Sequence, residues 1–182
     1  GIAPEKRLIL YLGLLSRKKN PDLLLRAFAS IDLPNVQLLI AGPDVDGCIG
    51  ELRALRDSLG LQQRVVFVGP LYNENKLSAL VDADVFVLPS QNENFGNAIA
   101  ESIAVGTPVV ITDKCGIAPF VRDKVGLVVP VEQDAVRDAL VRLLLDPVLH
   151  QSLSDGCKKV AKELSWDEPV AQLQRLYRSL II

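Results

Sequence analysis

Two carboxylates eight residues apart are the side chains of this 182-residue chain best placed to do chemistry. Glu93 lies in the polar segment 89–97, which reads PSQNENFGN, and Glu101 follows inside a predicted helix. Carboxylates accept hydrogen bonds from hydroxyl groups, and the free amides at a helix start bind phosphate oxygens. Eight residues of helix span about 12 Å at most. That length suits a diphosphate with a hydroxyl-bearing group at each end, which we expect this segment to bind.

Each charge in this region also has an ordinary structural explanation. Glu93 could cap the following helix or face its dipole, and Glu101 could be a solvated helix residue. The cluster Arg17-Lys18-Lys19 could be a solvated loop, because Lys and Arg side chains are mostly exposed. The spacing alone does not separate these alternatives from ligand binding. The elements that position the residues must therefore be considered.

Apolar runs and helical periodicity alternate along the chain, which is the order that βα units produce. Most runs are apolar at nearly every position, as in parallel strands covered by helices on both faces. We predict an α/β fold, a Rossmann-like doubly wound parallel sheet of about six strands with a helical C-terminal tail. The predicted strands cover 7–13, 36–41, 64–68, 84–88, 108–111 and 126–129. The predicted helices cover 21–30, 48–59, 74–82, 97–105, 132–145, 147–163 and 166–180.

Short connections and the absence of an internal repeat predict one domain over residues 1–182. Asn20-Pro21 predicts a helix start, with the Asn side chain accepting from the first free amides. Gly60 and Gly106 predict helix ends at which the backbone φ is positive.

The two terminal helices are expected to pack on the core. Leu149, Leu153, Val160 and Leu164 recur there at helical spacing. Trp166 is expected to anchor this packing. An apolar stripe left partly exposed on these helices would favour self-association.

The loops after the strands should form the binding site, because ligands of open parallel sheets bind outside the carboxyl ends of the strands. Gly13, Gly42 and Gly69 stand at or just after strand ends, where the missing side chain lets a ligand approach the backbone. Helices that open directly after such loops direct free amides and a positive dipole end toward an anion. The loops concerned are 13–20, 42–47, 69–73, 89–97 and 112–117.

The composition argues against several kinds of partner. Lys and Arg number 20 against 22 Asp and Glu, so a net charge of −2 creates no general attraction for nucleic acid or an anionic membrane. No apolar run approaches the roughly 20 residues that cross a bilayer. Cys48, Cys115 and Cys157 have neither disulfide nor metal spacing, and the N-terminus lacks a signal-peptide pattern. We therefore expect a cytoplasmic protein with free thiols and no membrane span.

Two Asp-x-Asp strings raise the alternative of a metal site. Asp82 and Asp84 fall at the start of a strand, at the edge of the sheet opposite the predicted site, which favours a cap or turn. Asp44 and Asp46 lie on the ligand edge, yet a Gly-Pro-Asp turn explains them, and two carboxylates alone bind a hard cation poorly. We expect no metal and no other cofactor. His150 is expected to be an ordinary surface residue.

Several segments, in order and at matching spacing, resemble the C-terminal, donor-binding half of family 4 glycosyltransferases, enzymes of the GT-B fold. The first strand, basic loop and helix of that family resemble YLGLLSRKKNPDLLLRAF. Its second and third strand ends resemble LLIAGPD and RVVFVGPLYNENK, and its closing helix resembles LSWDEPVAQLQRLYRSL. Its signature resembles ADVFVLPSQNENFGNAIAESIAVGTPVV, which places the paired glutamates at Glu93 and Glu101.

The resemblance implies a role for each candidate site residue. Glu101 would bind the ribose hydroxyls of a nucleotide-diphosphate sugar, Glu93 would contact the donor sugar, and Lys19 would neutralise the diphosphate. Other residues would provide backbone amides, a backbone edge that reads the base, or room for phosphates and sugar. This remaining donor-binding set comprises Gly13, Arg17, Gly42, Leu71, Asn94, Phe95, Gly96 and Asn97.

Two positions depart from the family pattern. Leu14 stands where the family commonly has an Arg that grips the diphosphate. Arg17 could reach the site instead, or the donor could be bound more weakly or held differently. Phe120 stands where the family often has an acidic residue, and the loop after it looks about one residue short. Both departures concern donor affinity rather than the fold.

The resemblance further implies metal-free transfer of a glycosyl group, with retention, to a polysaccharide, lipopolysaccharide or glycolipid acceptor. It also implies an N-terminal acceptor-binding domain as partner, a full-length enzyme that could sit peripherally on a membrane, and an isolated chain that transfers nothing at a useful rate. Two alternatives stay open, because fold does not fix chemistry. One is a non-catalytic nucleotide-binding module, and the other is a nucleotide-sugar epimerase.

Overall fold

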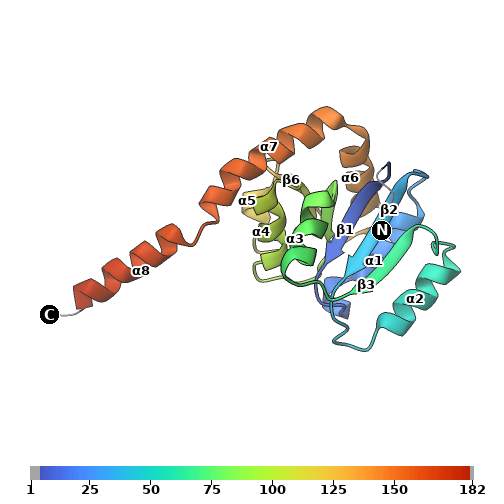
Figure 1. Ribbon diagram of the computed structural model, residues 1–182, viewed down its shortest axis with the longest axis horizontal. Coiled ribbons are helices and arrows are strands. Elements are labelled where there is room, and N and C mark those ends of the chain that lie inside the picture. The colour runs from blue at the N-terminus through green and yellow to red at the C-terminus, as the bar shows by residue number, and fades with distance from the viewer. Residues whose placement is uncertain (1–4, 181–182) are drawn as a thin grey trace.

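Six parallel strands form one sheet in the computed structural model, which describes residues 5–180 (Figure 1). The strand order is β3-β2-β1-β4-β5-β6, and every neighbouring pair is parallel. This arrangement confirms the predicted doubly wound sheet. The strands are β1 (Arg7–Leu12), β2 (Val36–Ala41), β3 (Val65–Gly69), β4 (Val85–Leu88), β5 (Val109–Thr112) and β6 (Gly126–Val129).

Helices cover both faces of the sheet, because right-handed crossovers run outward from β1 in one direction and from β4 in the other. On one face α1 packs against α2 and α6, whereas on the other face α3 packs against α4 (Figure 1). The helices are α1 (Pro21–Ala29), α2 (Ile49–Ser58), α3 (Asn73–Asp82), α4 (Asn97–Val105), α5 (Ala118–Val121), α6 (Gln133–Leu145), α7 (Pro147–Glu163) and α8 (Asp167–Leu180). The short helix α5 and a 3-10 turn, η1 (Arg17–Lys19), are too short to show periodicity and were not predicted.

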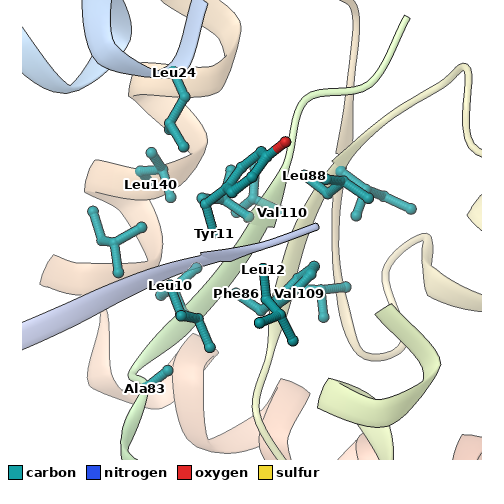
Figure 2. Close-up of a cluster of buried hydrophobic side chains, with 14 of the residues drawn as sticks. Leu10, Tyr11, Leu12, Leu24, Ala83, Phe86, Leu88, Val109, Val110 and Leu140 are labelled. Carbon is teal, nitrogen blue, oxygen red and sulfur yellow. The ribbon is translucent and has the colours of Figure 1, made fainter. Parts of the chain in front are cut away.

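The core lies where the strand order reverses, between β1 and β4. Ile9 pairs with Val85 and Leu10 with Phe86 across this junction, and all four side chains are fully buried. Figure 2 shows how Tyr11, Leu10 and Phe86 pack with side chains of β5, α1 and α6. Because the loops after β1 and β4 lead to opposite faces of the sheet, this junction leaves room for a ligand at its carboxyl end.

Helix α7 crosses the opposite, amino-terminal edge of the sheet and contacts both α4 and α6. His150 Nε2 lies 2.7 Å from the carbonyl oxygen of Asp84, directly before β4, and Ser154 Oγ donates to the carbonyl of Gly106 at 2.7 Å. The expectation that His150 is an ordinary surface residue is therefore wrong, because its ring ties α7 to the start of a central strand. This edge is closed by a helix, and the carboxyl edge stays open.

Helix ends are partly as predicted. Gly60 and Gly106 have φ of 69° and 93°, which confirms the left-handed backbone expected at these positions. Asn20 does precede α1, but its own φ is 60° and its side chain makes no capping hydrogen bond. Asn tolerates the left-handed region better than most residues, so Asn20 provides the turn between η1 and α1 rather than an acceptor.

The terminal helices differ from each other in burial. Leu153 and Val160 of α7 are buried as predicted, whereas α8 has no buried residue and extends away from the sheet (Figure 1). Trp166 is 78% exposed, so the expectation that it anchors packing is wrong. No helix within residues 5–180 is both long enough and apolar enough to cross a membrane.

The three cysteines, Cys48, Cys115 and Cys157, are buried free thiols, as expected from their spacing.

Strand β3 is less covered than its apolar sequence predicts. Val66 and Val68 are exposed because β3 is an edge strand of the sheet.

Candidate functional site

A cavity of about 480 Å³ opens at the carboxyl ends of β1, β2 and β4, and we refer to it as the carboxyl-edge cavity. It lies at the reversal of strand order, where the fold predicts a ligand. Eight of the predicted site residues line it: Gly13, Lys19, Gly42, Leu71, Glu93, Gly96, Asn97 and Glu101. Residues 80 positions apart in sequence therefore meet around one space.

The floor of the carboxyl-edge cavity depends on a close backbone approach between the ends of β1 and β2. Gly42 has φ of 149°, and a Cβ at this position would lie 1.7 Å from the carbonyl oxygen of Gly13. Below this crossing, the buried hydroxyl of Tyr11 donates to the carbonyl of Leu14 at 2.8 Å. Burial raises the pKa of Tyr11 well above its ordinary value, so the hydroxyl keeps the proton that it donates.

Lys19 and Glu93 form an ion pair on one wall of the cavity. Lys19 is the last residue of η1, and the two side chains are only 17% and 16% exposed. Removing one partner of a pair with so little solvent would leave an uncompensated charge. The structure thus contradicts the alternative that Lys19 is a solvated loop residue and that Glu93 is a simple cap.

The segment that carries Glu93 is held by backbone hydrogen bonds on both sides. Glu93 donates its N–H to the carbonyl of Lys114 at 3.0 Å, and Gly116 donates to the carbonyl of Glu93 at 2.8 Å. A Cβ on Gly116 would lie 1.9 Å from the carbonyl oxygen of Asn94, so only glycine fits there. Sequence reasoning missed Gly116 as a positioning residue, although a glycine shortly after a predicted strand was an available signal.

The start of α4 presents unpaired amides to the cavity. Gly96 precedes the helix with φ of 93°, and its carbonyl accepts from the N–H groups of Ile99 and Ala100. Within residues 5–180, the N–H groups of Asn97 and Ala98 have no protein acceptor, and both residues line the cavity. Such amides, together with the positive end of the helix dipole, are suited to phosphate oxygens.

Glu101 lies one helical turn further along α4 and has its own cation. Lys76 of α3 donates from Nζ to Glu101 Oε1 at 2.7 Å, and both residues line the cavity. Sequence reasoning missed Lys76, because a lysine four residues into a helix carries no signal of what the helix packs against. The pair shows that Glu101 is not simply a solvated helix residue.

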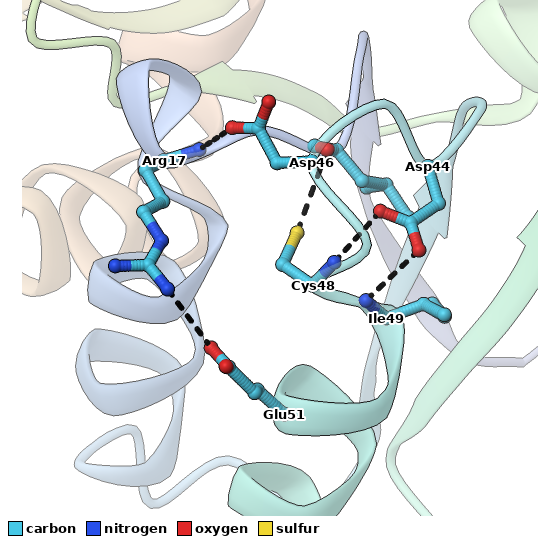
Figure 3. Close-up of polar contacts among 7 residues, drawn as sticks. Arg17, Asp44, Asp46, Cys48, Ile49 and Glu51 are labelled. Carbon is cyan, nitrogen blue, oxygen red and sulfur yellow. Dashed lines mark hydrogen bonds and ion pairs between the residues drawn. The ribbon is translucent and has the colours of Figure 1, made fainter.

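Three predicted site residues do not line the cavity. The guanidinium of Arg17 is exposed and lies 3.8 Å from Glu51 of α2, on a separate cavity of about 360 Å³ (Figure 3). In this structure Arg17 therefore does not line the carboxyl-edge cavity in place of the missing basic residue. Asn94 contributes its backbone beside Gly116, and the exposed ring of Phe95 lies outside the cavity lining.

An apolar side chain occupies the position of that missing arginine. Leu14 lines the carboxyl-edge cavity and is 46% exposed. The cations on the cavity wall are thus Lys19 and Lys76, each already paired with a carboxylate. Both lysine charges are therefore balanced by carboxylates, whereas the α4 amides that face the cavity are unpaired within residues 5–180.

The Asp-x-Asp strings have structural partners. Asp44 accepts from the N–H groups of Cys48 and Ile49 at 2.9 and 3.2 Å, and Asp46 accepts from the N–H of Arg17 at 2.9 Å (Figure 3). Elsewhere, Asp84 accepts from the N–H of Leu8 at 2.7 Å and so joins β4 to β1. Residues 5–180 contain no group of three or more His, Cys, Asp or Glu side chains arranged to hold a metal ion.

The cavity therefore combines carboxylates for hydroxyl groups, amides and lysines for phosphate, and an apolar end. The apolar end is formed by Leu71, Tyr72 and Pro43, a surface on which a planar base could lie. Comparison with known proteins identifies the family. Residues 1–163 match a family model described as "Glycosyl transferases group 1".

The chain belongs to the group 1 glycosyltransferases. Among the relatives of this glycosyltransferase domain is a D-inositol 3-phosphate glycosyltransferase from Corynebacterium urealyticum, which is 35% identical over 192 residues. The alignment covers 99% of this chain but only 45% of that relative. The domain thus spans about half the length of the curated relatives it matches.

Solved glycosyltransferase structures share the fold. A sucrose-phosphate synthase from Thermosynechococcus elongatus superimposes with a TM-score of 0.86 at 31% identity, covering 98% of this chain and 46% of that one. The Anabaena protein Alr3699/HepE, solved in complex with UDP and glucose, superimposes with a TM-score of 0.85 at 21% identity, covering 94% of this chain and 48% of that one. The domain has the Rossmann-like architecture of these GT-B proteins.

The backbone crossing at Gly42 is testable by substitution. We expect Gly42→Ala to lower the free energy of unfolding by about 2 to 4 kcal/mol, because the new methyl group meets the Gly13 carbonyl and the backbone φ disfavours any side chain. Gly50→Ala is the matched control, since its Cβ would meet no atom within 4 Å. Urea denaturation should show the control within about 1 kcal/mol of the unsubstituted chain. Equal stability of both variants would contradict the close approach.

Proposed function

We propose that this glycosyltransferase domain binds a nucleotide-diphosphate sugar in the carboxyl-edge cavity and acts with an acceptor-binding domain. The reaction would be that of a family 4 enzyme, which transfers the glycosyl group with retention to a polysaccharide, lipopolysaccharide or glycolipid. One observation carries the proposal. Glu93 and Glu101 line the same cavity, on either side of the free amides that begin α4.

Each group then has a role that its chemistry allows. Glu101 accepts from the ribose hydroxyls and Glu93 from hydroxyls of the donor sugar, because carboxylates are acceptors only. Lys19 and the amides of Asn97 and Ala98 hold the diphosphate. As the bond from the anomeric carbon to the phosphate oxygen breaks, its electron pair stays on the diphosphate, and these donors stabilise the charge. The acceptor hydroxyl oxygen forms the new bond to the anomeric carbon, and its proton passes to the departing phosphate oxygen. No metal or other cofactor is included in this proposal.

Two observations support a nucleotide-sugar ligand over other anions. The cavity provides an apolar end at Leu71 and Tyr72 in addition to the phosphate donors, as a nucleoside requires. A protein of the same fold, HepE, was solved with UDP and glucose.

The alternatives of a binding module and an epimerase share the cavity but differ in its use. A module would bind free nucleotide without Glu93, and an epimerase would convert its sugar nucleotide without an acceptor.

Calorimetric titration with UDP, GDP, ADP, CDP and their common sugar conjugates tests donor binding. We expect saturable binding of one nucleotide family, weakened about tenfold or more by Glu101→Gln, because a charged acceptor for the ribose hydroxyls is lost. Glu163→Gln, at an exposed glutamate on the last turn of α7, is the matched control and should bind normally. Binding that is equal in the Glu101 variant would refute the assignment of Glu101.

The same titrations on Glu93→Gln separate a transferase from a module. The unsubstituted chain should prefer the complete sugar nucleotide to the free diphosphate, and Glu93→Gln should lose this preference. Circular dichroism checks that the variant folds, since Glu93 pairs with Lys19. A preference for the sugar that survives the substitution would remove Glu93 from the sugar site.

We further propose that α8 contacts the acceptor-binding domain. Its apolar residues Val170, Leu173, Leu176, Tyr177 and Leu180 are all exposed, and the relatives of this domain are about twice its length. An apolar stripe of this kind is typical of an interface. In a chain studied without that domain, a second copy would cover the stripe.

This association predicts a concentration-dependent dimer in sedimentation velocity. Leu173→Gln combined with Leu176→Gln should yield a monomer at every concentration, because it removes apolar area from the stripe. Arg178→Gln, which changes α8 away from the stripe, is the control and should still dimerise. A monomeric unsubstituted chain at high micromolar concentration would contradict self-association.

A further inference from the structure

Lys76 forms an ion pair with Glu101, just as Lys19 forms an ion pair with Glu93. Each of the two glutamates in the carboxyl-edge cavity is paired with a lysine from a different element, η1 for Glu93 and α3 for Glu101. The wall of the cavity thus carries two lysine–glutamate ion pairs. The proposed function uses three of these four side chains and leaves Lys76 without a role.

The contact fixes one oxygen of Glu101 and leaves the other available. Lys76 Nζ lies 2.7 Å from Oε1, and this is the hydrogen bond that the structure shows for the Glu101 side chain within residues 5–180. The two side chains are 34% and 40% exposed, so the pair is partly shielded and borders the cavity directly. A glutamate side chain this exposed would otherwise sample several rotamers and lose entropy on meeting a ligand.

The position of Lys76 on α3 determines how its side chain reaches Glu101. The loop that contains Leu71 and Tyr72 leads directly into α3, and Lys76 is the fourth residue of that helix. Because α3 packs against α4, the lysine reaches across the helix pair to Glu101. The same short stretch of chain therefore forms the apolar end of the cavity and sets the orientation of Glu101.

We propose that Lys76 is a positioning residue for donor binding, which holds the Glu101 carboxylate oriented toward the two ribose hydroxyls of a nucleoside diphosphate. This inference rests on the proposed function, since it needs a ribose at Glu101. Lys76 acts through Glu101, so its effect is confined to ligands that carry those hydroxyls. A lysine that merely joined α3 to α4, or merely attracted the diphosphate, would act on all nucleotides alike.

The test compares two ligands on four proteins by calorimetric titration. The ligands are whichever of UDP, GDP, ADP and CDP the unsubstituted chain binds most tightly, and its 2′,3′-dideoxy counterpart, which lacks both ribose hydroxyls. The proteins are the unsubstituted chain, Lys76→Met, Lys76→Arg and Lys158→Met. Lys158, exposed on α7, is the control for loss of one positive charge far from the cavity. Thermal melts confirm that all four fold.

The unsubstituted chain should bind the ribonucleotide at least about tenfold more tightly than the dideoxy ligand, as expected for hydrogen bonds to a charged acceptor. Lys76→Met should lose about tenfold in ribonucleotide affinity and less than about twofold in dideoxy affinity. Lys76→Arg should recover most of the loss, since it keeps a cation beside Glu101. Lys158→Met should match the unsubstituted chain.

Two results would overturn the inference while the proposed function stands. Lys76→Met could weaken the binding of both ligands equally, or it could leave both affinities unchanged, while Glu101→Gln still removes the preference for the ribonucleotide. If the unsubstituted chain binds none of the four nucleoside diphosphates, the proposed function itself fails, and the role of Lys76 fails with it. The pattern across the two ligands distinguishes these cases.

Discussion

The reversal of strand order between β1 and β4 is the constraint on which the site depends. Crossovers on the two sides of this junction run to opposite faces of the sheet, so the loops after β1 and β4 part and leave a cavity between them. The β1 loop brings Lys19 and the β4 loop brings Glu93, and their ion pair spans the junction. Helix α7 closes the opposite edge, so the carboxyl end is the open one.

Charge balance within the cavity follows from this arrangement. Two lysines and two glutamates neutralise each other before any ligand arrives, so the wall carries no net charge from these side chains. The remaining attraction for an anion comes from the α4 amides, whose partial charge is fixed by the helix itself. With Leu14 in the place of an arginine, a diphosphate bound as we propose would share Lys19 with Glu93. On the proposed function, the ligand would therefore be recognised by several modest contacts rather than by one strong cation.

Local patterns predicted the sheet, most helix bounds and the edge at which the carboxyl-edge cavity opens. Apolar runs predict strands directly. Gly60 and Gly106 predict helix ends, because a positive backbone φ is a local property of the residue. Side-chain partners could not be predicted in this way. Lys76 meets Glu101 because α3 packs on α4. Arg17 lies beside Glu51 of α2 and contacts Asp46, which is 29 residues away along the chain. These contacts depend on tertiary packing, which spacing in the sequence does not contain.

The central claim is that one nucleotide-diphosphate sugar occupies the carboxyl-edge cavity with hydroxyl groups at both glutamates. A crystal structure of the chain with the sugar nucleotide that it binds most tightly tests this claim most directly. The account predicts the diphosphate at the start of α4, the ribose at Glu101 and the sugar at Glu93. A ligand found in the cavity beside Arg17 and Glu51, or bound with its hydroxyl groups away from both glutamates, would contradict it.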